Sequence, residues 1–235
     1  MNNNDKDLEF LAFLEHWQAN LPVLKLSDVL THPEKAAITS IDLINGFCNS
    51  GALASPRMHD IVAPAAVLFS AAWQMGLHHI VLLQDTHGAN ALEFAQWPPH
   101  CLKGTPESET ITEIKNLPFY PQMVTFEKDS IHPALNTGFQ AWLDSHPEID
   151  TFIVTGDCSD LCTYQLAMHL RLDANAHMRQ RRVILPADCV QTYDMPVQTA
   201  VSLGILPHPG DFIHNFFLYH MALNGIEVVR TLEAK

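Results

Sequence analysis

The strongest constraint on the fold is a repeated alternation of short apolar segments and helical segments along the chain. Six short, nearly unbroken apolar segments are expected to be strands, at residues 36–42, 79–85, 123–128, 151–156, 182–188 and 226–232. Helical periodicity is found between or after them, at residues 58–75, 134–145, 160–177, 197–206 and 211–224. Apolar strands that alternate with helices are typical of a parallel sheet covered on both faces. We therefore predict an α/β fold, a Rossmann-like three-layer α/β/α arrangement with a six-stranded parallel sheet.

The chain has 235 residues, which suits a single α/β domain. Residues 1–34 carry a helical apolar pattern followed by a proline-containing turn, before the first strand begins. We expect an N-terminal helical extension over 1–34 and one domain over 35–235. No GxGxxG or GxxxxGK[ST] sequence is present, so these phosphate-binding loops are not predicted.

The charge of the chain argues against several classes of partner. Its 13 Lys and Arg residues against 26 Asp and Glu residues give a net charge of −13, which disfavours binding to nucleic acid or to an anionic membrane. No apolar run is long enough to span a bilayer, and the first residues lack the pattern of a signal peptide. We expect a cytoplasmic protein. The five scattered cysteines are expected to be free thiols.

Three polar residues follow strands of the predicted sheet, where α/β proteins bind their ligands. Asp42 ends the first strand, Lys128 ends the third, and Cys162 lies at the start of the helix after the fourth. A helix N-terminus and a nearby cation both lower the pKa of a thiol, and a carboxylate can accept its proton. The three residues are candidates for nucleophilic catalysis, although each taken alone is also compatible with burial or capping.

A second cluster follows the second strand and has the composition of a metal site. Asp85, His87, Glu93 and His100 provide two carboxylates and two imidazoles, a ligand set that suits Zn²⁺ and also Mn²⁺ or Fe²⁺. The alternative is a loop of hydrogen-bonded histidines in a chain that contains 14 of them.

Together these residues resemble the nicotinamidase and isochorismatase superfamily of cysteine hydrolases, from about Ala36 to Leu232. The segment SIDLINGF is similar to the family's catalytic aspartate followed by a substrate-packing aromatic, which here are Asp42 and Phe47. VTGDCSDLC resembles the nucleophile loop and gives Cys162 the place of the nucleophile, and Lys128 has the position of the catalytic lysine. The resemblance implies an isochorismatase-like hydrolase fold.

The metal cluster favours the nicotinamidase branch, because isochorismatase-type members generally lack the ion. DTHGANALEFAQWPPHC resembles the nicotinamidase stretch, in which Asp85, His87 and His100 correspond to metal ligands and Glu93 to a further ligand of some members. The resemblance implies one divalent metal, with Zn²⁺ expected first.

The resemblance also implies a substrate pocket and an oxyanion site. A carboxamide substrate would lie over the nucleophile with Phe47 and Trp97 beside its ring, and Ile131 stands where several nicotinamidases place an aromatic. Backbone N–H groups of Cys158 and Cys162 would bind the oxyanion, next to a cis peptide between Asp157 and Cys158.

The predicted function is therefore metal-dependent hydrolysis of nicotinamide to nicotinate and ammonia through a cysteine thioester. The alternatives are a related cysteine hydrolase of another small amide, an isochorismatase-type hydrolase, and a catalytically silent binding module. We expect a homo-oligomer with a small-molecule carboxamide as its partner. Asp160 is expected to cap the helix behind the nucleophile, and His214 to lie at the surface.

Overall fold

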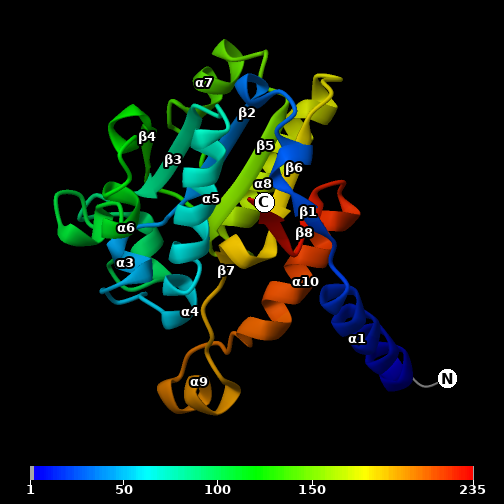
Figure 1. Ribbon diagram of the computed structural model, residues 1–235. Helices are drawn as coiled ribbons and strands as arrows, with labels where there is room; N and C mark the ends of the chain where they lie inside the picture. Colours follow the sequence, from blue (N-terminus) through cyan, green and yellow to red (C-terminus); the bar gives the residue numbers. More distant parts are fainter. Residues whose placement is uncertain (1–2, 235) are drawn as a thin grey trace.

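The computed structural model describes residues 3–234, which form a central parallel sheet flanked by helices (Figure 1). Six strands lie in the order β4-β3-β2-β5-β6-β8, and every neighbouring pair is parallel. These strands are β2 (Ala36–Ile41), β3 (His79–Asp85), β4 (Val124–Lys128), β5 (Thr151–Asp157), β6 (Arg182–Pro186) and β8 (Glu227–Val229). The short β7 (Val190–Gln191) pairs with β5 as a seventh strand. The predicted α/β fold and its six main strands are confirmed.

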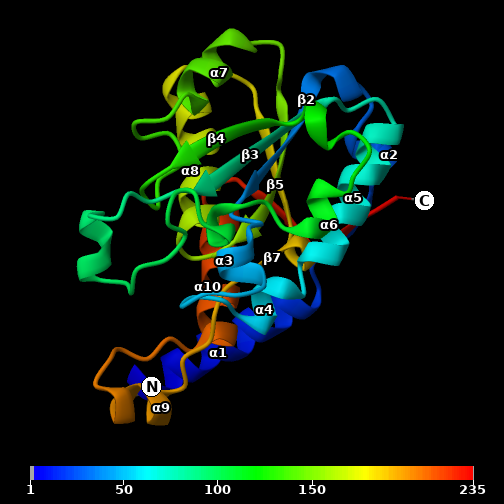
Figure 2. The same cartoon turned by 90° about the vertical axis from the view of Figure 1, so that its left-hand side faces the viewer.

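Helices cover both faces of this sheet, as the two views show (Figures 1 and 2). The α-helices are α1 (Asn3–Ala19), α2 (Leu26–Val29), α3 (Asn45–Cys48), α4 (Pro56–His59), α5 (Val62–Gln74), α6 (Thr112–Lys115), α7 (Phe139–Ser145), α8 (Cys162–Ala176), α9 (Val197–Leu203) and α10 (Gly210–Leu223). Short 3-10 helices are η1 (Pro33–Lys35), η2 (Leu92–Ala95), η3 (Pro106–Ser108), η4 (Tyr120–Gln122) and η5 (Ala187–Cys189). Within residues 3–234, no helix is both long and apolar enough to cross a lipid bilayer.

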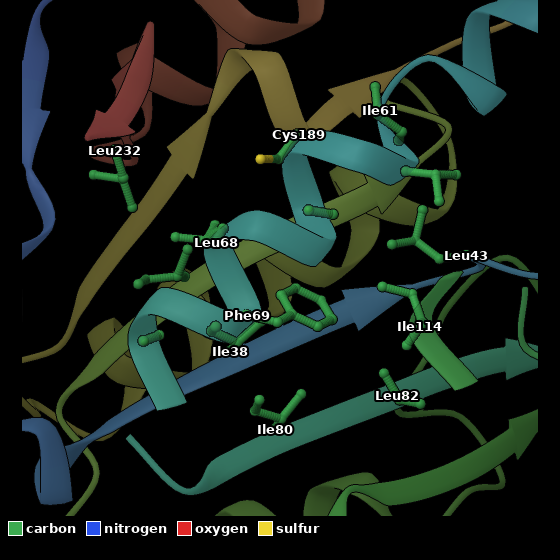
Figure 3. Close-up of a cluster of buried hydrophobic side chains, with 14 of the residues drawn as sticks. Ile38, Leu43, Ile61, Leu68, Phe69, Ile80, Leu82, Ile114, Cys189 and Leu232 are labelled. Carbon is green, nitrogen blue, oxygen red and sulfur yellow. The ribbon is translucent and has the colours of Figure 1, made fainter. Parts of the chain in front are cut away.

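The side chains of the strands alternate between two apolar cores. Ile80 and Leu82 of β3 join the core beneath α5, where Phe69 packs over the sheet (Figure 3). Val81 and Leu83 of the same strand point into the other core, which α7, α8 and α10 cover. Because successive strand residues point to opposite faces, a strand buried on both sides must be apolar at every position. This explains the unbroken apolar runs of the sequence.

A second sheet joins segments from near the two ends of the described chain. β1 (Val23–Lys25) pairs in parallel with β9 (Thr231–Glu233). Leu26, directly after β1, is fully buried in the core beneath α5. The single strand predicted at 226–232 divides at Arg230, whose N–H donates to the carbonyl of Pro22, so that β8 joins the main sheet and β9 the small one.

Two helices differ from their predicted bounds for local reasons. The helix predicted over 134–145 begins only at Phe139, because the Thr137 hydroxyl donates to the Pro133 carbonyl and accepts from the Phe139 N–H. These bonds form a turn that replaces the first helical turn. The helix predicted over 58–75 is divided into α4 and α5, with the break after His59.

Gly156 lets two central strands approach closely beside the site. Its φ of +115° is a conformation that L-residues rarely adopt, and a Cβ there would lie 1.8 Å from the carbonyl oxygen of Ile41. β2 and β5 pair at these two residues. A side chain at this position would therefore push β5 away from β2.

We expect Gly156→Ala to lower the free energy of unfolding by about 2–4 kcal/mol, because it adds backbone strain to a steric overlap. Urea denaturation followed by circular dichroism measures this change. Gly88→Ala is the matched control, since a Cβ at Gly88 has no neighbour within 4 Å. Equal effects of the two substitutions would contradict this account of the β2–β5 contact.

Candidate active site

Strand ends and one helix start place four chemically active side chains together. Lys128, the last residue of β4, lies directly opposite Asp85, the last residue of β3. Its Nζ is 2.8 Å from Asp42 Oδ2, donates to Asp85 Oδ1, and lies 3.4 Å from the Sγ of Cys162 at the start of α8. The Asp85 N–H donates to Asp42 Oδ1 at 2.8 Å. The structure thus brings the three predicted catalytic residues into one contact group.

Burial decides the proton affinities in this group, because all four side chains are almost inaccessible to solvent. Burial, with the charge of Asp85, raises the pKa of Asp42 to about 7 although Lys128 opposes the rise. Lys128 is the dominant partner that lowers the pKa of Asp85 against the effect of burial, and the two carboxylates raise the pKa of Lys128. One ammonium thus holds one carboxylate ionised, and the second carboxylate titrates near neutral pH.

The thiol of Cys162 differs from the sequence-based expectation. Burial raises the pKa of Cys162 well above its usual range, and Lys128 only partly offsets this rise. The expectation of a lowered thiol pKa is therefore wrong for this structure, because desolvation outweighs the nearby cation. A thiol with a raised pKa needs a nearby base to accept its proton. The Asp42 carboxylate is available for this role, because Asp42 and Cys162 both contact Lys128.

The loop that precedes Cys162 has the predicted cis peptide between Asp157 and Cys158. The predicted helix-capping role of Asp160 is wrong, since no side chain caps α8 at Leu161. The Asp160 carboxylate instead accepts hydrogen bonds from Thr192 and His208, which lie beyond β7. Cap propensity is a local preference, and two strong donors from a distant segment have overridden it.

Three of the four predicted metal ligands lie together on the other side of Asp85. The ligand atoms of Asp85, His87 and His100 are within 4.8 Å of one another, and all three residues are buried. His87 Nε2 lies 3.5 Å from Asp85 Oδ2, yet neither ring nitrogen of His87 has a partner at hydrogen-bond geometry. Buried imidazole nitrogens normally have a hydrogen-bond partner. Because those of His87 have none, the two imidazoles and the carboxylate of this group fit the coordination of a divalent cation.

The two histidines of this group respond differently to their surroundings. Burial lowers the pKa of His100, whose Nδ1 faces the Pro98 carbonyl at 2.8 Å and leaves Nε2 toward Asp85. A neutral imidazole is the form that binds a metal. Asp85 raises the pKa of His87 against the effect of burial.

Glu93, the fourth predicted ligand, does not join the group of three ligand atoms. It is half-buried in η2, where its charge helps to raise the pKa of His87. The loop therefore places Glu93 close enough to His87 to influence its pKa, but outside the group of three ligand atoms.

The three predicted substrate-contacting residues lie in different settings. Phe47 is buried with its ring centroid 5.7 Å from that of His100. Ile131 packs against the apolar core that contains Cys162. The ring of Trp97 contacts Tyr193, at a centroid distance of 6.0 Å. Among the described residues, Phe47 and Trp97 do not form a ring pair with each other.

Sequence reasoning missed two residues beside the nucleophile loop. His214 was expected at the surface but is 7% exposed, and its Nδ1 lies 2.9 Å from the Ser159 hydroxyl. Tyr193 follows β7, and its backbone lies near the Cys158 thiol, whose pKa it lowers against the effect of burial. Both contacts join residues more than 30 positions apart, and no local pattern in the sequence marks them.

Lys128→Met should leave two buried carboxylates without their cation and lower the free energy of unfolding by about 3–5 kcal/mol. Lys103→Met removes an exposed pair with Glu127 and should cost at most about 1 kcal/mol. Urea denaturation of both variants at pH 8 measures the difference. Similar losses for the two would show that Lys128 is not the cation on which this site depends.

Comparisons with known proteins agree with this fold. The chain is 25% identical over 216 residues to Nicotinamidase 1 of Arabidopsis thaliana, an alignment that covers 86% of this chain and 88% of that protein. The fold is similar to the pyrazinamidase of Pyrococcus horikoshii in complex with zinc (TM-score 0.64, 22% identity, 83% of this chain and 99% of that one). It is also similar to the N-carbamoylsarcosine amidase of Thermoplasma acidophilum (TM-score 0.62, 23% identity, 86% and 97%).

A family profile, the isochorismatase domain, matches residues 36–228. This match spans the central sheet from the start of β2 to Val228 of β8, and it includes the contact group around Lys128, the nucleophile loop and the histidine cluster. The chain therefore belongs to the isochorismatase family of hydrolases.

Proposed function

We propose that this hydrolase converts nicotinamide to nicotinate and ammonia through a thioester on Cys162. The observation that carries the proposal is the position of Lys128, which contacts the candidate base Asp42, the candidate nucleophile Cys162 and the candidate metal ligand Asp85. A nucleophile beside a metal site suits an amide whose ring nitrogen can bind the metal. Similarity to a nicotinamidase of Arabidopsis thaliana supports this choice of substrate.

The first half of the reaction forms the thioester. Asp42 takes the proton of the Cys162 thiol while the sulfur attacks the amide carbon. Lys128 stays protonated, and its charge offsets the negative charge that develops in the buried group. Asp42 then gives its proton to the leaving nitrogen, so that ammonia departs as the C–N bond breaks.

The second half of the reaction repeats the use of Asp42. Asp42 takes a proton from a water molecule that attacks the thioester carbon, and returns this proton to the Cys162 sulfur as the C–S bond breaks. The nicotinic acid formed gives its own proton to solvent or to the released ammonia and leaves as nicotinate. The oxyanion of each step would be bound by backbone N–H groups of Cys158 and Cys162. The second of these lies at the first turn of α8, where N–H groups lack helical acceptors. Loss of one such donor typically costs about 10²- to 10³-fold in rate.

The substrate ring is held by the remaining residues of the site. Asp85, His87 and His100 would hold a divalent cation, for which Zn²⁺ is the first choice and Mn²⁺ or Fe²⁺ are alternatives. When bound, the cation supplies a Lewis-acid contact for the pyridine nitrogen. Phe47, Trp97 and Ile131 would pack around the ring, and the aliphatic Ile131 makes this part of the pocket less aromatic than one with a third ring.

Cys162→Ala should abolish ammonia release from nicotinamide while the far-ultraviolet circular dichroism spectrum stays native, because the thiol is the attacking group. Cys189→Ala is the matched control, since Cys189 is equally buried but lies after β6, away from the contact group. We expect this control to retain turnover. Release of ammonia by Cys162→Ala at the rate of the unsubstituted protein would refute the mechanism. If neither protein releases ammonia from nicotinamide, a screen of other small amides follows.

His87→Ala should lower the affinity for Zn²⁺ by at least about tenfold, because it removes a ligand whose ring nitrogens have no other partner. Isothermal titration of the metal-stripped protein measures the affinity without reference to activity. Glu93→Gln should have a smaller effect, since Glu93 lies outside the group of three ligand atoms. Equal affinities of His87→Ala and the unsubstituted protein would place the metal elsewhere.

A further inference from the structure

Residues 192–210 form a projecting segment next to the nucleophile loop, which we call the α9 arm. The arm leaves the sheet after β7, carries α9, and returns at the start of α10; it is drawn in orange below the body of the molecule in Figure 1. The outgoing and returning segments of the arm are joined near the body of the molecule, at what we call the base of the arm. There Met195 and His208 exchange backbone hydrogen bonds of 2.7 and 2.9 Å. The arm therefore has a closed base beside the site.

The base of the arm is tied to the nucleophile loop through Asp160. This residue lies between Cys158 and Cys162, and its carboxylate is 7% exposed. One carboxylate oxygen accepts from the Thr192 hydroxyl at 2.5 Å, and the other is 2.9 Å from Nε2 of His208. Both ends of the arm's base are thus bonded to one buried side chain.

The second ring nitrogen of His208 fixes the charge of this contact. Its Nδ1 is 3.0 Å from the backbone carbonyl of Tyr193, while Nε2 faces the carboxylate of Asp160. Both partners only accept hydrogen bonds, so the ring satisfies both only when both nitrogens carry protons. Asp160 and the carbonyl raise the pKa of His208 against the effect of burial, in agreement with this geometry.

The charged ring of His208 also stacks on the ring of Tyr193. The two centroids are 3.8 Å apart with an interplanar angle of 14°. A cation over the face of an aromatic ring is attracted to it, most strongly where water is excluded. His208 therefore fixes Tyr193 at two points, through its backbone carbonyl and through its ring.

Tyr193 links the two loops that bound the catalytic centre. Its backbone lies near the thiol of Cys158, in the nucleophile loop, and lowers the pKa of that thiol against the effect of burial. Its ring contacts Trp97, which belongs to the loop between His87 and His100. It is half-buried and packs against the apolar core together with Leu161, the neighbour of Cys162. The ring of Tyr193 therefore lies next to both loops that carry candidate site residues.

We propose that Asp160 and His208 form a clasp that holds the ring of Tyr193 beside Trp97, so that the two rings make one wall of the substrate pocket. Tyr193 is then a specificity-determining residue for the ring of the substrate, and Asp160 and His208 are positioning residues. The role of the wall rests on the proposed function, whereas the clasp itself does not. The wall would provide the aromatic surface that Ile131 does not.

The clasp is tested without substrate by hydrogen exchange of the full-length protein, followed by mass spectrometry. Asp160→Asn and His208→Gln should each raise the exchange rates of peptides from residues 192–210 about tenfold, because each removes a charged hydrogen bond. The double variant should add little to either single change. His220→Gln is the matched control, because His220 contacts Tyr164 in a similar pair between α8 and α10. Unchanged exchange of the arm in Asp160→Asn and His208→Gln would overturn the clasp.

The wall is tested by steady-state hydrolysis of nicotinamide. Tyr193→Ala should raise KM about 2- to 10-fold with kcat unchanged, since an aromatic contact contributes uniform binding. Tyr193→Phe should behave as the unsubstituted protein because the ring remains. His208→Gln should raise KM in the same way, and His220→Gln should not. An unchanged KM in Tyr193→Ala, or a fall in kcat alone, would overturn the wall.

The outcomes separate this proposal from the proposed function. If the unsubstituted protein does not hydrolyse nicotinamide, the choice of substrate is wrong, and the exchange experiment still decides the clasp. In that case the KM comparison is made with the amide that the protein does hydrolyse. If nicotinamide is hydrolysed and the Tyr193→Ala protein retains its KM, the proposed function stands and the wall does not.

Discussion

The contact between Lys128 and two buried carboxylates is the interaction on which the site depends. Burial of a charge is costly unless a partner of opposite charge is present. Here the ammonium of Lys128 contacts Asp42 and Asp85, and all three side chains are almost fully buried. Burial, together with the charge of Asp85, raises the pKa of Asp42 to about 7, while Lys128 lowers the pKa of Asp85 against the effect of burial. Burial of this contact group thus makes Asp42 a carboxylate that can accept a proton near neutral pH.

The sheet determines where these charges lie. The carboxyl ends of neighbouring parallel strands meet at one edge, which is the usual ligand site of such folds. β2, β3 and β4 are consecutive in the sheet, and the functional residues are the last residue of β3, the last residue of β4 and the residue after β2. Close approach of β2 and β5 at Gly156 then brings the nucleophile loop and Cys162 to the same edge. The chemistry therefore follows from strand order.

Most of this arrangement could be predicted from the sequence. Apolar runs buried on both faces identified the strands, and the polar residues at their ends identified Asp42, Lys128 and Cys162 as neighbours. The contact of Lys128 with Asp85, which was predicted as part of a separate metal cluster, came from the structure. The spacing of the nucleophile loop, read through a family resemblance, identified Cys162 and the cis peptide after Asp157. These features are local, because each is defined by residues close together in the chain.

The remaining features depend on contacts between distant segments. The pairing of β1 with β9 joins residues about 200 positions apart, and neither short strand has a distinctive pattern. Asp160 was expected to cap α8, but its partners Thr192 and His208 lie 32 and 48 residues away. The upward pKa shift of Cys162 depends on the depth of burial, which residue types alone do not reveal.

The central claim of this account is that Cys162 carries the acyl group of the substrate during turnover. Hydroxylamine added during hydrolysis of nicotinamide intercepts a thioester, and the product mixture is analysed by liquid chromatography and mass spectrometry. The account predicts that nicotinohydroxamate forms at the expense of nicotinate, and that acid-quenched protein carries a nicotinoyl group on the peptide containing Cys162. Hydrolysis that proceeds with neither hydroxamate nor a modified peptide would contradict it.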